Sequence, residues 1–528
     1  MLNLQELVFE KKMNRSDLYN YKNNSENNYK ISVYRNHSFE LIEHTINLYL
    51  DYANINANFV YSDYDDSLTF FNLDLSSDLV IVWIDLTRYD SKDADNFIKE
   101  RLDYLSSIYK KQILFIPFGG SLKIEKSNII TYDLSELENK LGYKYTDLRL
   151  EPFSGTKLSA NAQMEISKNI GLKYIPSCLM PPIKAIILDL DNTLYKGVLG
   201  EDGYKNIELT QGHKQLQEKV VELFKQGFYI CIASKNEEHD VIEMFDRRTD
   251  FPLKLENITK LCVSWSPKSK SISEIQKFLN IGIKDMLFID DNLGEIASVK
   301  SAYPDINVIL AKDNPSVTLN MLENYPRMLK LNIHYEDSIR KQDTMANEKR
   351  TKLKNSLSKE DYLKTLGMEL TYGINKKSQI KRIAELANKT NQFICTYKRY
   401  SESEIEDMMH DGRYMIVTVS LKDKLSDSGI IGVLVFKNNP DSIDIEECFI
   451  SCRALGRGID ESIILYPIKL AAEHFNKNKI KFNFIRGEKN EPAEKFINMN
   501  LSNYKNTAAL YDKNIDTSLI KIKTEEGI

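Results

Sequence analysis

Polar residues follow three short apolar runs of the chain, at the point where each run ends. The runs have the length of buried strands, and the carboxyl ends of parallel strands meet at one edge of a sheet, where ligands bind. Carboxylates so close together repel, and a divalent cation, or an anionic substrate with its cation, would relieve this repulsion. The residues are Asp189, Asp191 and Thr193 after 185–188, Ser234 after 228–233, Asp290 and Asp291 after 286–289, and Lys268 in the string WSPK between the last two runs.

The elements that must position these residues alternate along the chain. Helical periodicity over 213–226 and 272–279 separates the apolar runs, which predicts an α/β fold with a parallel sheet. The same alternation occurs upstream, and a third pattern of helices and strands begins near 366. We therefore expect a polar N-terminal extension 1–30, an α/β domain 31–180, a second α/β domain 181–312, a charged helical linker 313–364 and an α+β domain 365–528.

The composition is that of a globular protein with several domains. At 528 residues the chain is too long for one hydrophobic core. A formal net charge of -5 indicates no basic surface for nucleic acid. No window approaches the roughly 20 apolar residues of a membrane span, and the N-terminus lacks a secretory signal. Six cysteines without a CxxC pair argue against a zinc site or a disulfide framework. We expect a cytoplasmic protein that binds neither nucleic acid nor a membrane.

The polar groups, taken in order, resemble the four motifs of the haloacid dehalogenase-like (HAD) phosphatases, of which the first is Asp-x-Asp-x-Thr. The resemblance implies that Asp189 attacks phosphorus and forms an aspartyl-phosphate, and that Asp191 is the general acid. It also implies that Thr193 completes the catalytic motif, that Ser234 hydrogen-bonds a phosphoryl oxygen, and that Lys268 neutralises developing negative charge.

Magnesium is the cofactor that this resemblance implies. Its ligands would be Asp189, the backbone carbonyl of Asp191, and Asp290. Asp291 is either a further ligand or a neighbour of the ligands, and the sequence does not decide between these roles. The simpler alternative is that the polar residues only cap strands and turns. That alternative explains any one of them better than it explains four motifs in order, although a HAD fold without activity stays open.

Longer strings resemble the FkbH-like proteins of HAD subfamily IIIC over most of the chain. This resemblance implies three domains: an SGNH-like parallel-sheet domain, a Rossmann-like HAD domain and a GNAT-like α+β acyltransferase domain. Tyr195 and Lys196 depart from it, because family members more often have Trp and Gly at these positions. The strings are DLDNTLYKGVLGEDG at 189–203, SKN at 234–236, WSPK at 265–268, FIDDN at 288–292, TNQF at 390–393, RYSE at 399–402, IIG at 430–432 and SCRALGRG at 451–458.

The activity implied by this family resemblance is that of a bifunctional glyceryl transferase/phosphatase. Such an enzyme dephosphorylates 1,3-bisphosphoglycerate and loads the glyceryl unit, as a thioester, onto the phosphopantetheine of an acyl carrier protein in secondary-metabolite (polyketide-like) biosynthesis. An acyl phosphate is already activated toward thiols, so a cysteine can capture the carboxyl carbon without ATP. Two alternatives stay open: a magnesium-dependent HAD phosphatase of another small phosphorylated metabolite, and a non-catalytic scaffold that docks carrier proteins.

The C-terminal string 451–458 contains the candidate residues for acyl transfer. Cys452 is the candidate acyl carrier, because a glycine-rich turn and an arginine follow it and would favour its thiolate. Against this, Cys448 and Cys452 share one face of a strand, where cysteines commonly only pack. By resemblance to GNAT acyltransferases, a phosphate of the cofactor would bind at the helix start that follows the turn. The turn residues that match are Arg453, Gly456, Arg457 and Gly458.

Ser38 lies near the position at which SGNH-like hydrolases have their nucleophile. The usual Gly-Asp-Ser string is absent, and the chain reads Asn36-His37-Ser38. We therefore expect a turn residue that caps the following helix. A scaffold or partner-docking role follows for this first domain.

Overall fold

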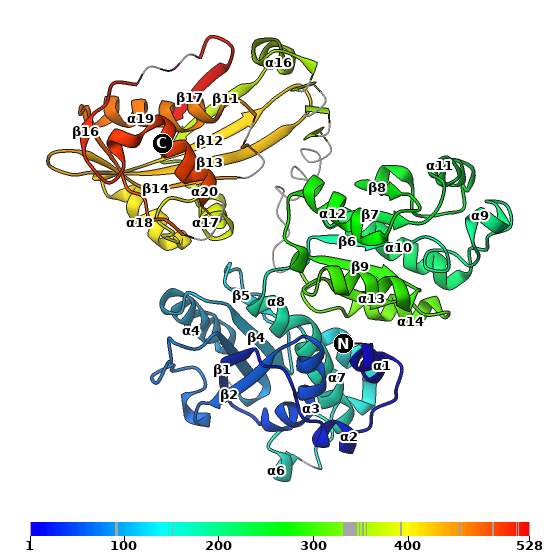
Figure 1. The fold of residues 1–528 in the computed structure, drawn as a ribbon. Coiled ribbons are helices and arrows are strands. Elements are labelled where there is room, and N and C mark those ends of the chain that lie inside the picture. The colour runs from blue at the N-terminus through cyan, green and yellow to red at the C-terminus, as the bar shows by residue number, and fades with distance from the viewer. Residues whose placement is uncertain are drawn as a thin grey trace. The chain divides into compact units, whose positions relative to one another are not determined.

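The computed structural model of the chain contains two compact units (Figure 1). Unit 1 comprises Met1–Lys277 and Ile281–Ile333, and unit 2 comprises Phe278–Asn280 and His334–Ile528. Among the residues that the structure describes, no helix is both long and apolar enough to cross a membrane. These residues are 2–89 (without the side chain of 65), 93–149, 151–330, 346–347, 349–350, 353–354, 356–390, 393–451, 454–455, 457–487, 490–513, 515 and 517–526.

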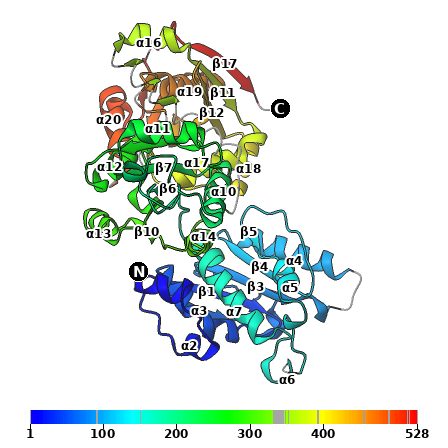
Figure 2. The ribbon, with the colours of Figure 1, turned by 90° about the vertical axis from the view of Figure 1, so that its right-hand side faces the viewer.

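The first sheet of unit 1 has five parallel strands in the order β2-β1-β3-β4-β5. β3 is buried along its whole length, as expected for a strand with helices on both faces. Figure 2 shows α3 and α7 side by side against this sheet, and α4 packs on the opposite face. The elements are β1 (Asn28–Arg35), α3 (Glu40–Tyr52), β2 (Asn56–Tyr61), β3 (Leu79–Asp85), α4 (Ala94–Ile108), β4 (Ile113–Phe118), β5 (Ile129–Thr131), α5 (Ser135–Leu141), α6 (Glu151–Ser154), α7 (Ala160–Asn169) and α8 (Ile175–Leu179).

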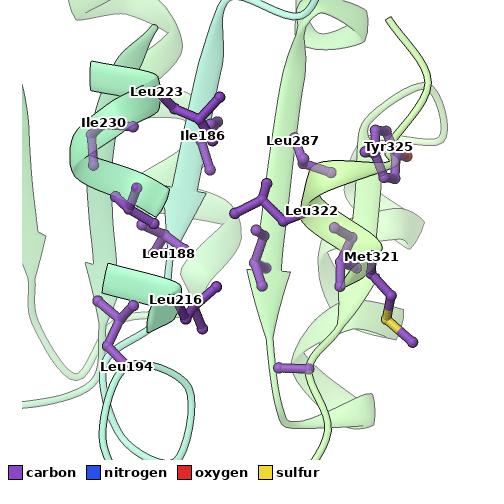
Figure 3. Close-up of a cluster of buried hydrophobic side chains, with 14 of the residues drawn as sticks. Ile186, Leu188, Leu194, Leu216, Leu223, Ile230, Leu287, Met321, Leu322 and Tyr325 are labelled. Carbon is purple, nitrogen blue, oxygen red and sulfur yellow. The ribbon is translucent and has the colours of Figure 1, made fainter. Parts of the chain in front are cut away.

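The second sheet of unit 1 is also parallel, in the order β10-β9-β6-β7-β8. Figure 3 shows its core, in which Ile186 and Leu188 of the central strand β6 belong to one buried cluster with Leu216, Leu223 and Leu322 of the covering helices. The elements are β6 (Ala185–Leu188), α9 (Leu199–Asp202), α10 (Gln211–Lys225), β7 (Tyr229–Ser234), α11 (Glu238–Arg247), β8 (Lys260–Val263), α12 (Lys268–Leu279), β9 (Met286–Asp290), α13 (Leu293–Ala302), β10 (Asn307–Leu310) and α14 (Pro315–Glu323).

The N-terminal residues, which the sequence predicts as a polar extension, pack into unit 1. They form α1 (Leu2–Phe9) and α2 (Arg15–Asn20), which contact α3. The Gln5 amide binds both backbone groups of Leu310 on the edge strand β10, with Nε2 to O at 3.0 Å and N to Oε1 at 3.1 Å. Val8 and Leu18 are buried in the core of the second sheet. The N-terminal segment is therefore an integral part of unit 1.

Unit 2 contains one seven-stranded mixed sheet in the order β16-β15-β14-β13-β12-β11-β17. Only the pairs β14·β15 and β11·β17 are parallel. Pro467 lies inside α19. The elements are α16 (Lys359–Leu366), β11 (Glu369–Ile374), α17 (Ile380–Lys389), α18 (Glu402–His410), β12 (Tyr414–Lys422), β13 (Asp427–Asn438), β14 (Ile443–Ile450), α19 (Asp460–Phe475), β15 (Lys479–Phe482), α20 (Glu491–Asn500), β16 (Ala509–Leu510) and β17 (Lys521–Glu526).

The fold class predicted from the sequence is confirmed: two parallel sheets with their helices are followed by a mixed sheet. Both ends of the stretch expected as a linker, 313–364, pack into the units. α14 packs against α10 in unit 1, and α16 places Tyr362, Leu363 and Leu366 in the core of unit 2. Residues 331–345, in the middle of that stretch, lie outside the described residues.

Candidate phosphoryl-transfer site

The carboxyl edge of the second sheet brings together the polar ends of three strands. Leu188 of β6 pairs with Ile232 of β7 and Ile289 of β9, so Asp189 emerges beside the ends of both neighbouring strands. Ser234 ends β7, and its Oγ donates to Asp189 Oδ1 at 2.7 Å. Asp290 ends β9 and is fully buried. The strand order alone therefore places the first, second and fourth predicted motifs at one point.

Lys268 joins two of these carboxylates. It is the first residue of α12, and its side chain is only 5% exposed. Nζ lies 3.0 Å from Asp189 Oδ1 and donates to Asp290 Oδ2 at 2.5 Å. Burial disfavours the ammonium, but the charges of these two aspartates outweigh burial and raise the pKa of Lys268. The lysine is therefore charged and fixed between the ends of β6 and β9.

Three carboxylates of the site lie close enough to share one metal ion. Asp189, Asp290 and Asp291 each offer an oxygen, and these oxygens lie within 4.8 Å of one another. Burial and the charge of Asp189 raise the pKa of Asp290 to about 7, and they also raise the pKa of Asp291. Burial raises the pKa of Asp189, against the opposing effect of Lys268. One lysine thus faces three carboxylates, and this oxygen donor set fits Mg2+.

The turn between β9 and α13 fixes Asp290. Asp290 Oδ1 accepts from the backbone N of Asn292 at 2.9 Å. Asn292 caps α13, because its Oδ1 accepts from the backbone N of Gly294 and Glu295 at 2.8 and 3.3 Å. The sequence Asp-Asp-Asn therefore folds locally as a strand end followed by a capped helix. This turn holds the Asp290 carboxylate towards Lys268.

Asp191, which the sequence also predicts as a metal ligand through its backbone carbonyl, has a carboxylate that lies outside the cluster of three. Its Oδ1 accepts from Tyr195 Oη at 2.6 Å and from the backbone N of Leu199 at 3.0 Å. Its Oδ2 accepts from Asn236 Nδ2 at 2.9 Å. Both carboxylate oxygens are thus held by donors of the chain. This half-buried side chain therefore has different neighbours from those of Asp189.

Thr193 and two residues without a predicted role complete the description of this edge. Thr193 is buried, and among the described residues its Oγ1 has no hydrogen-bond partner. Tyr195 and Asn236, by contrast, both contact a predicted site residue. Asn236 was visible as the third residue of the SKN string. No pattern in the sequence indicates the contact of Tyr195 with Asp191.

The candidate acyl-transfer residues of unit 2 are described only in part. Cys452, Arg453 and Gly456 lie outside the described residues. Arg457 is buried, and its Nη1 donates to Ser428 Oγ at 3.0 Å and lies 3.7 Å from Asp423 Oδ2. Gly458 has a φ of +79°, a backbone conformation that residues other than glycine rarely adopt. Cys448 is fully buried on β14, as a packing cysteine would be.

Ser38 does not cap α3, in contrast to our expectation. The cap position is Phe39, and Ser38 Oγ donates to the side chain of Glu40 at 2.9 Å. Glu40 also pairs with Arg35. The neighbouring His37 is fully buried, and its Nδ1 bonds Thr156 Oγ1 at 3.0 Å. The described contacts of Ser38 therefore include no histidine that could act as its base.

Comparisons with known proteins give only distant structural likenesses. No protein-family model matches the chain, and a search of curated proteins finds no match. The N-terminal part of protein BF1531 from Bacteroides fragilis, which contains a phosphatase domain and was crystallised with Mg, is 22% identical, with 62% of this chain and 98% of that one covered and a TM-score of 0.46.

Two further structures match a shorter part of the chain. A ribosomal-protein-alanine N-acetyltransferase from Brucella melitensis biovar Abortus 2308 is 14% identical, covering 28% of this chain and 98% of that one at a TM-score of 0.21. An uncharacterised protein from Corynebacterium glutamicum is 13% identical, covering 27% and 93% at a TM-score of 0.20. At these scores we base the proposals below on side-chain geometry.

Proposed function

We propose that unit 1 is a magnesium-dependent phosphatase that acts on a small phosphomonoester through Asp189. The observation that carries this proposal is the cluster of three carboxylates, Asp189, Asp290 and Asp291, for which Lys268 is the one paired cation among the described residues. The cluster has a formal charge of -2 when all three carboxylates are ionised, because one ammonium offsets one of them. A phosphate dianion would be repelled by such a site.

A divalent cation removes this repulsion. Asp189, Asp290 and Asp291 would hold Mg2+, which supplies positive charge to the phosphoryl oxygens and lets a carboxylate approach phosphorus. Ser234 and Lys268 are placed to bind phosphoryl oxygens beside Asp189. The lysine is buried and immobile, so its charge needs no reorganisation as negative charge develops.

The two aspartates of the first motif have different hydrogen-bond partners, and we assign them different roles. Asp189 lies in the carboxylate cluster, where phosphate would bind, and so serves as the nucleophile. Asp191 is held apart by its own donors and serves as the acid and base. An Asp189 oxygen attacks phosphorus, the bond from phosphorus to the leaving oxygen breaks, and that oxygen takes the proton of Asp191.

The second step returns the protein to its starting state. Water attacks the phosphorus of the aspartyl-phosphate and gives a proton to Asp191. The bond from phosphorus to the Asp189 oxygen breaks at the same time, so inorganic phosphate leaves. Asp189 is again a carboxylate and Asp191 again carries a proton, and the net reaction is the hydrolysis of one phosphomonoester.

Phosphate release from p-nitrophenyl phosphate, with Mg2+ or with EDTA, tests this proposal. We expect activity only with Mg2+, complete loss in Asp189→Asn, and no change in Glu218→Gln, a matched exposed carboxylate on α10. Mass spectrometry of acid-quenched wild type should show one added phosphoryl group on the peptide that contains Asp189. Phosphate release that persists in Asp189→Asn would overturn the proposal.

We further propose, from the motif resemblance described above, that the full chain transfers a glyceryl unit from 1,3-bisphosphoglycerate to the phosphopantetheine of an acyl carrier protein. The phosphate ester of that substrate suits the Asp189 site, and its acyl phosphate reacts with a thiol. Cys452 would carry the acyl group, by attack of its thiolate on the carboxyl carbon and departure of phosphate. The chain then has a second active site, in unit 2, and a separate carrier protein as its partner.

Incubation with 1,3-bisphosphoglycerate, Mg2+ and a phosphopantetheinylated carrier protein tests this second proposal, with both proteins weighed by mass spectrometry. We expect the mass of a glyceryl group on the enzyme and then on the carrier, and no glyceryl group on Cys452→Ala. Phosphate release without acylation of either protein would indicate a phosphatase of another metabolite. Binding of the carrier without any chemistry would indicate a docking scaffold.

A further inference from the structure

The carboxylate of Asp191 is held by three donors that come from two separate segments of the chain. Tyr195 Oη and the backbone N of Leu199 donate to Oδ1 at 2.6 and 3.0 Å. Tyr195 lies in the loop after β6, and Leu199 is the first residue of α9, which follows that loop. Asn236 Nδ2 donates to Oδ2 at 2.9 Å and lies after β7. A carboxyl group on an exposed loop would rotate freely, whereas these contacts leave Asp191 one orientation.

The backbone of the loop brings Tyr195 across from Asp191. Asn192 has a φ of +53°, a left-handed conformation that asparagine tolerates in tight turns. Its amide group closes the turn, because Oδ1 accepts from the backbone N of Gly197 at 3.0 Å. Asp191 and Tyr195 form an isolated bridge across this turn. The turn at Asn192 therefore brings the side chains of Asp191 and Tyr195, four residues apart in sequence, into contact.

The ring of Tyr195 is fixed by the core beneath the site. Its side chain is fully buried and stacks on Phe251, with ring centroids 5.9 Å apart. Gln217 Nε2 donates to the carbonyl of the preceding residue, Leu194, at 2.8 Å. The hydroxyl thus reaches Asp191 from a ring that does not move, at the end of a packed apolar cluster.

Asn236 connects the same carboxylate to the proposed nucleophile. Its Nδ2 also lies 3.2 Å from Ser234 Oγ, and Ser234 Oγ donates to Asp189 Oδ1 at 2.7 Å. A continuous hydrogen-bond chain therefore runs from Asp191 through Asn236 and Ser234 to Asp189. It fixes the acid relative to the atom that attacks phosphorus, which is the geometry that general acid catalysis requires.

We propose that Tyr195 is the positioning residue for the general acid, and that it determines how well the enzyme cleaves phosphate esters with poor leaving groups. This inference rests on the proposed phosphatase function. The leaving oxygen of an alkyl phosphate must receive a proton as the bond to phosphorus breaks, whereas p-nitrophenolate leaves without one. Precise placement of Asp191 therefore matters for the first substrate class and little for the second.

A double-mutant cycle with Tyr195→Phe and Asp191→Asn tests this inference on an alkyl phosphate and on p-nitrophenyl phosphate. Because general acid catalysis contributes roughly 100-fold or more, we expect Tyr195→Phe to lower kcat on the alkyl phosphate by about 10- to 100-fold. On p-nitrophenyl phosphate we expect a change of less than about threefold, with KM and the Mg2+ requirement unchanged. In the Asp191→Asn background, Tyr195→Phe should have no further effect.

Tyr52→Phe is the matched control, because Tyr52 is also a buried tyrosine of unit 1 and, among the described residues, its hydroxyl has no partner. It should leave both substrates unaffected, and thermal unfolding should confirm that both variants are folded. Equal losses on the two substrates, or additive losses in the cycle, would overturn the positioning role. A wild type that hydrolyses neither substrate with Mg2+ contradicts the proposed function itself, so the two failures are distinguishable.

An independent variant covers the case in which Tyr195→Phe does not fold. Asn236→Ala removes the donor to Asp191 Oδ2 from a different loop. It should also lower kcat more on the alkyl phosphate than on p-nitrophenyl phosphate, because the same carboxylate loses its orientation. An equal effect on both substrates would contradict the hydrogen-bond chain as a positioning device.

Discussion

The two parallel sheets of unit 1 both place a buried aspartate at the end of a strand, and they treat its charge in opposite ways. Asp85 ends β3 of the first sheet, and Asp290 ends β9 of the second. Both side chains are fully buried. Each aspartate is the last residue of its strand. The difference between the two sites therefore lies in the residues that the surrounding loops supply.

The first sheet neutralises its aspartate. Asp85 Oδ1 accepts from the backbone N and the Oγ1 of Thr87 at 2.9 and 2.6 Å. Its Oδ2 lies 3.3 Å from Arg88 Nε and 3.3 Å from Lys157 Nζ. Burial opposes ionisation, but the Thr87 hydroxyl and the nearby positive charges outweigh it and lower the pKa of Asp85. One carboxylate here faces two cations, which is the arrangement of a structural ion cluster.

The second sheet leaves its carboxylates short of positive charge. Three of them lie together, Lys268 pairs with Asp189 and Asp290, and the pKa of each of the three carboxyl groups is raised. A strand-end aspartate is therefore weak evidence for a functional site by itself. More informative is the net charge of the aspartate together with the charged side chains around it. The predictions that follow compare the two aspartates directly.

The largest expected difference is in activity. Asp290→Asn should lower magnesium-dependent phosphate release by roughly 1000-fold, because metal and lysine both lose a carboxylate partner, which corresponds to about 4 kcal/mol of transition-state stabilisation. Asp85→Asn should change it by less than about twofold. Steady-state kinetics on p-nitrophenyl phosphate measures both values. A large loss in Asp85→Asn would show that the two sheet edges do not differ as described.

The next difference is in stability without metal. Asp85→Asn removes the carboxylate that Arg88 and Lys157 share, and only Arg88 keeps another partner, Glu151 at 3.6 Å. Because both cations are partly exposed, we expect a loss of about 2 kcal/mol. Asp291→Asn should instead stabilise the protein by about 0.5 kcal/mol, because it removes one repelling carboxylate. Thermal unfolding in EDTA should show midpoints on opposite sides of the wild type. Midpoints on the same side would contradict the charge argument.

The third expected effect is a pH dependence of stability that comes from His37, beside the first sheet. Burial lowers the pKa of His37 to about 3, from an ordinary value of 6.5. The unfolded chain then binds a proton that the folded chain does not, so stability falls as pH drops from 6.5 toward 3. Between pH 7 and 5.5 the loss is about 1 kcal/mol.

Urea unfolding of wild type and His37→Phe at these two pH values isolates the contribution of His37. Phenylalanine keeps the stacking on Trp83, at a centroid distance of 4.6 Å in the wild type, and cannot be protonated. The pH dependence should shrink in His37→Phe and persist in the control His44→Gln, which replaces an exposed histidine. An unchanged dependence in His37→Phe would mean that His37 is protonated in the folded state.

The predictable parts of the molecule are those that local patterns determine. Runs such as 79–84 and 286–289 are apolar over the length of a strand, so their strands and the α/β class follow from the sequence. Parallel pairing then brings Asp189, Ser234 and Asp290 to one edge. The contact of Tyr195 with Asp191 was not predictable, because it depends on a left-handed turn at Asn192 that one asparagine does not signal.

Contacts between distant segments account for the remaining differences. Nothing in the first 20 residues indicates that α1 contacts the second sheet, because the partner of Gln5 lies on β10, far away in sequence. Ser38 had the sequence of a helix cap, yet Glu40 competes for its hydroxyl. In both cases a side chain has several possible partners of similar chemistry, and the tertiary fold selects one.

The hydrogen bonds between Gln5 and Leu310 also have a consequence for synthesis of the chain. The two residues are 305 positions apart. At the usual pace of about 5–20 residues per second, the ribosome adds Leu310 roughly 15–60 seconds after Gln5. During that interval α1 can contact α3, but its hydrogen bonds to the edge strand β10 cannot form. The contacts of unit 1 are therefore complete only after β10 has been synthesised.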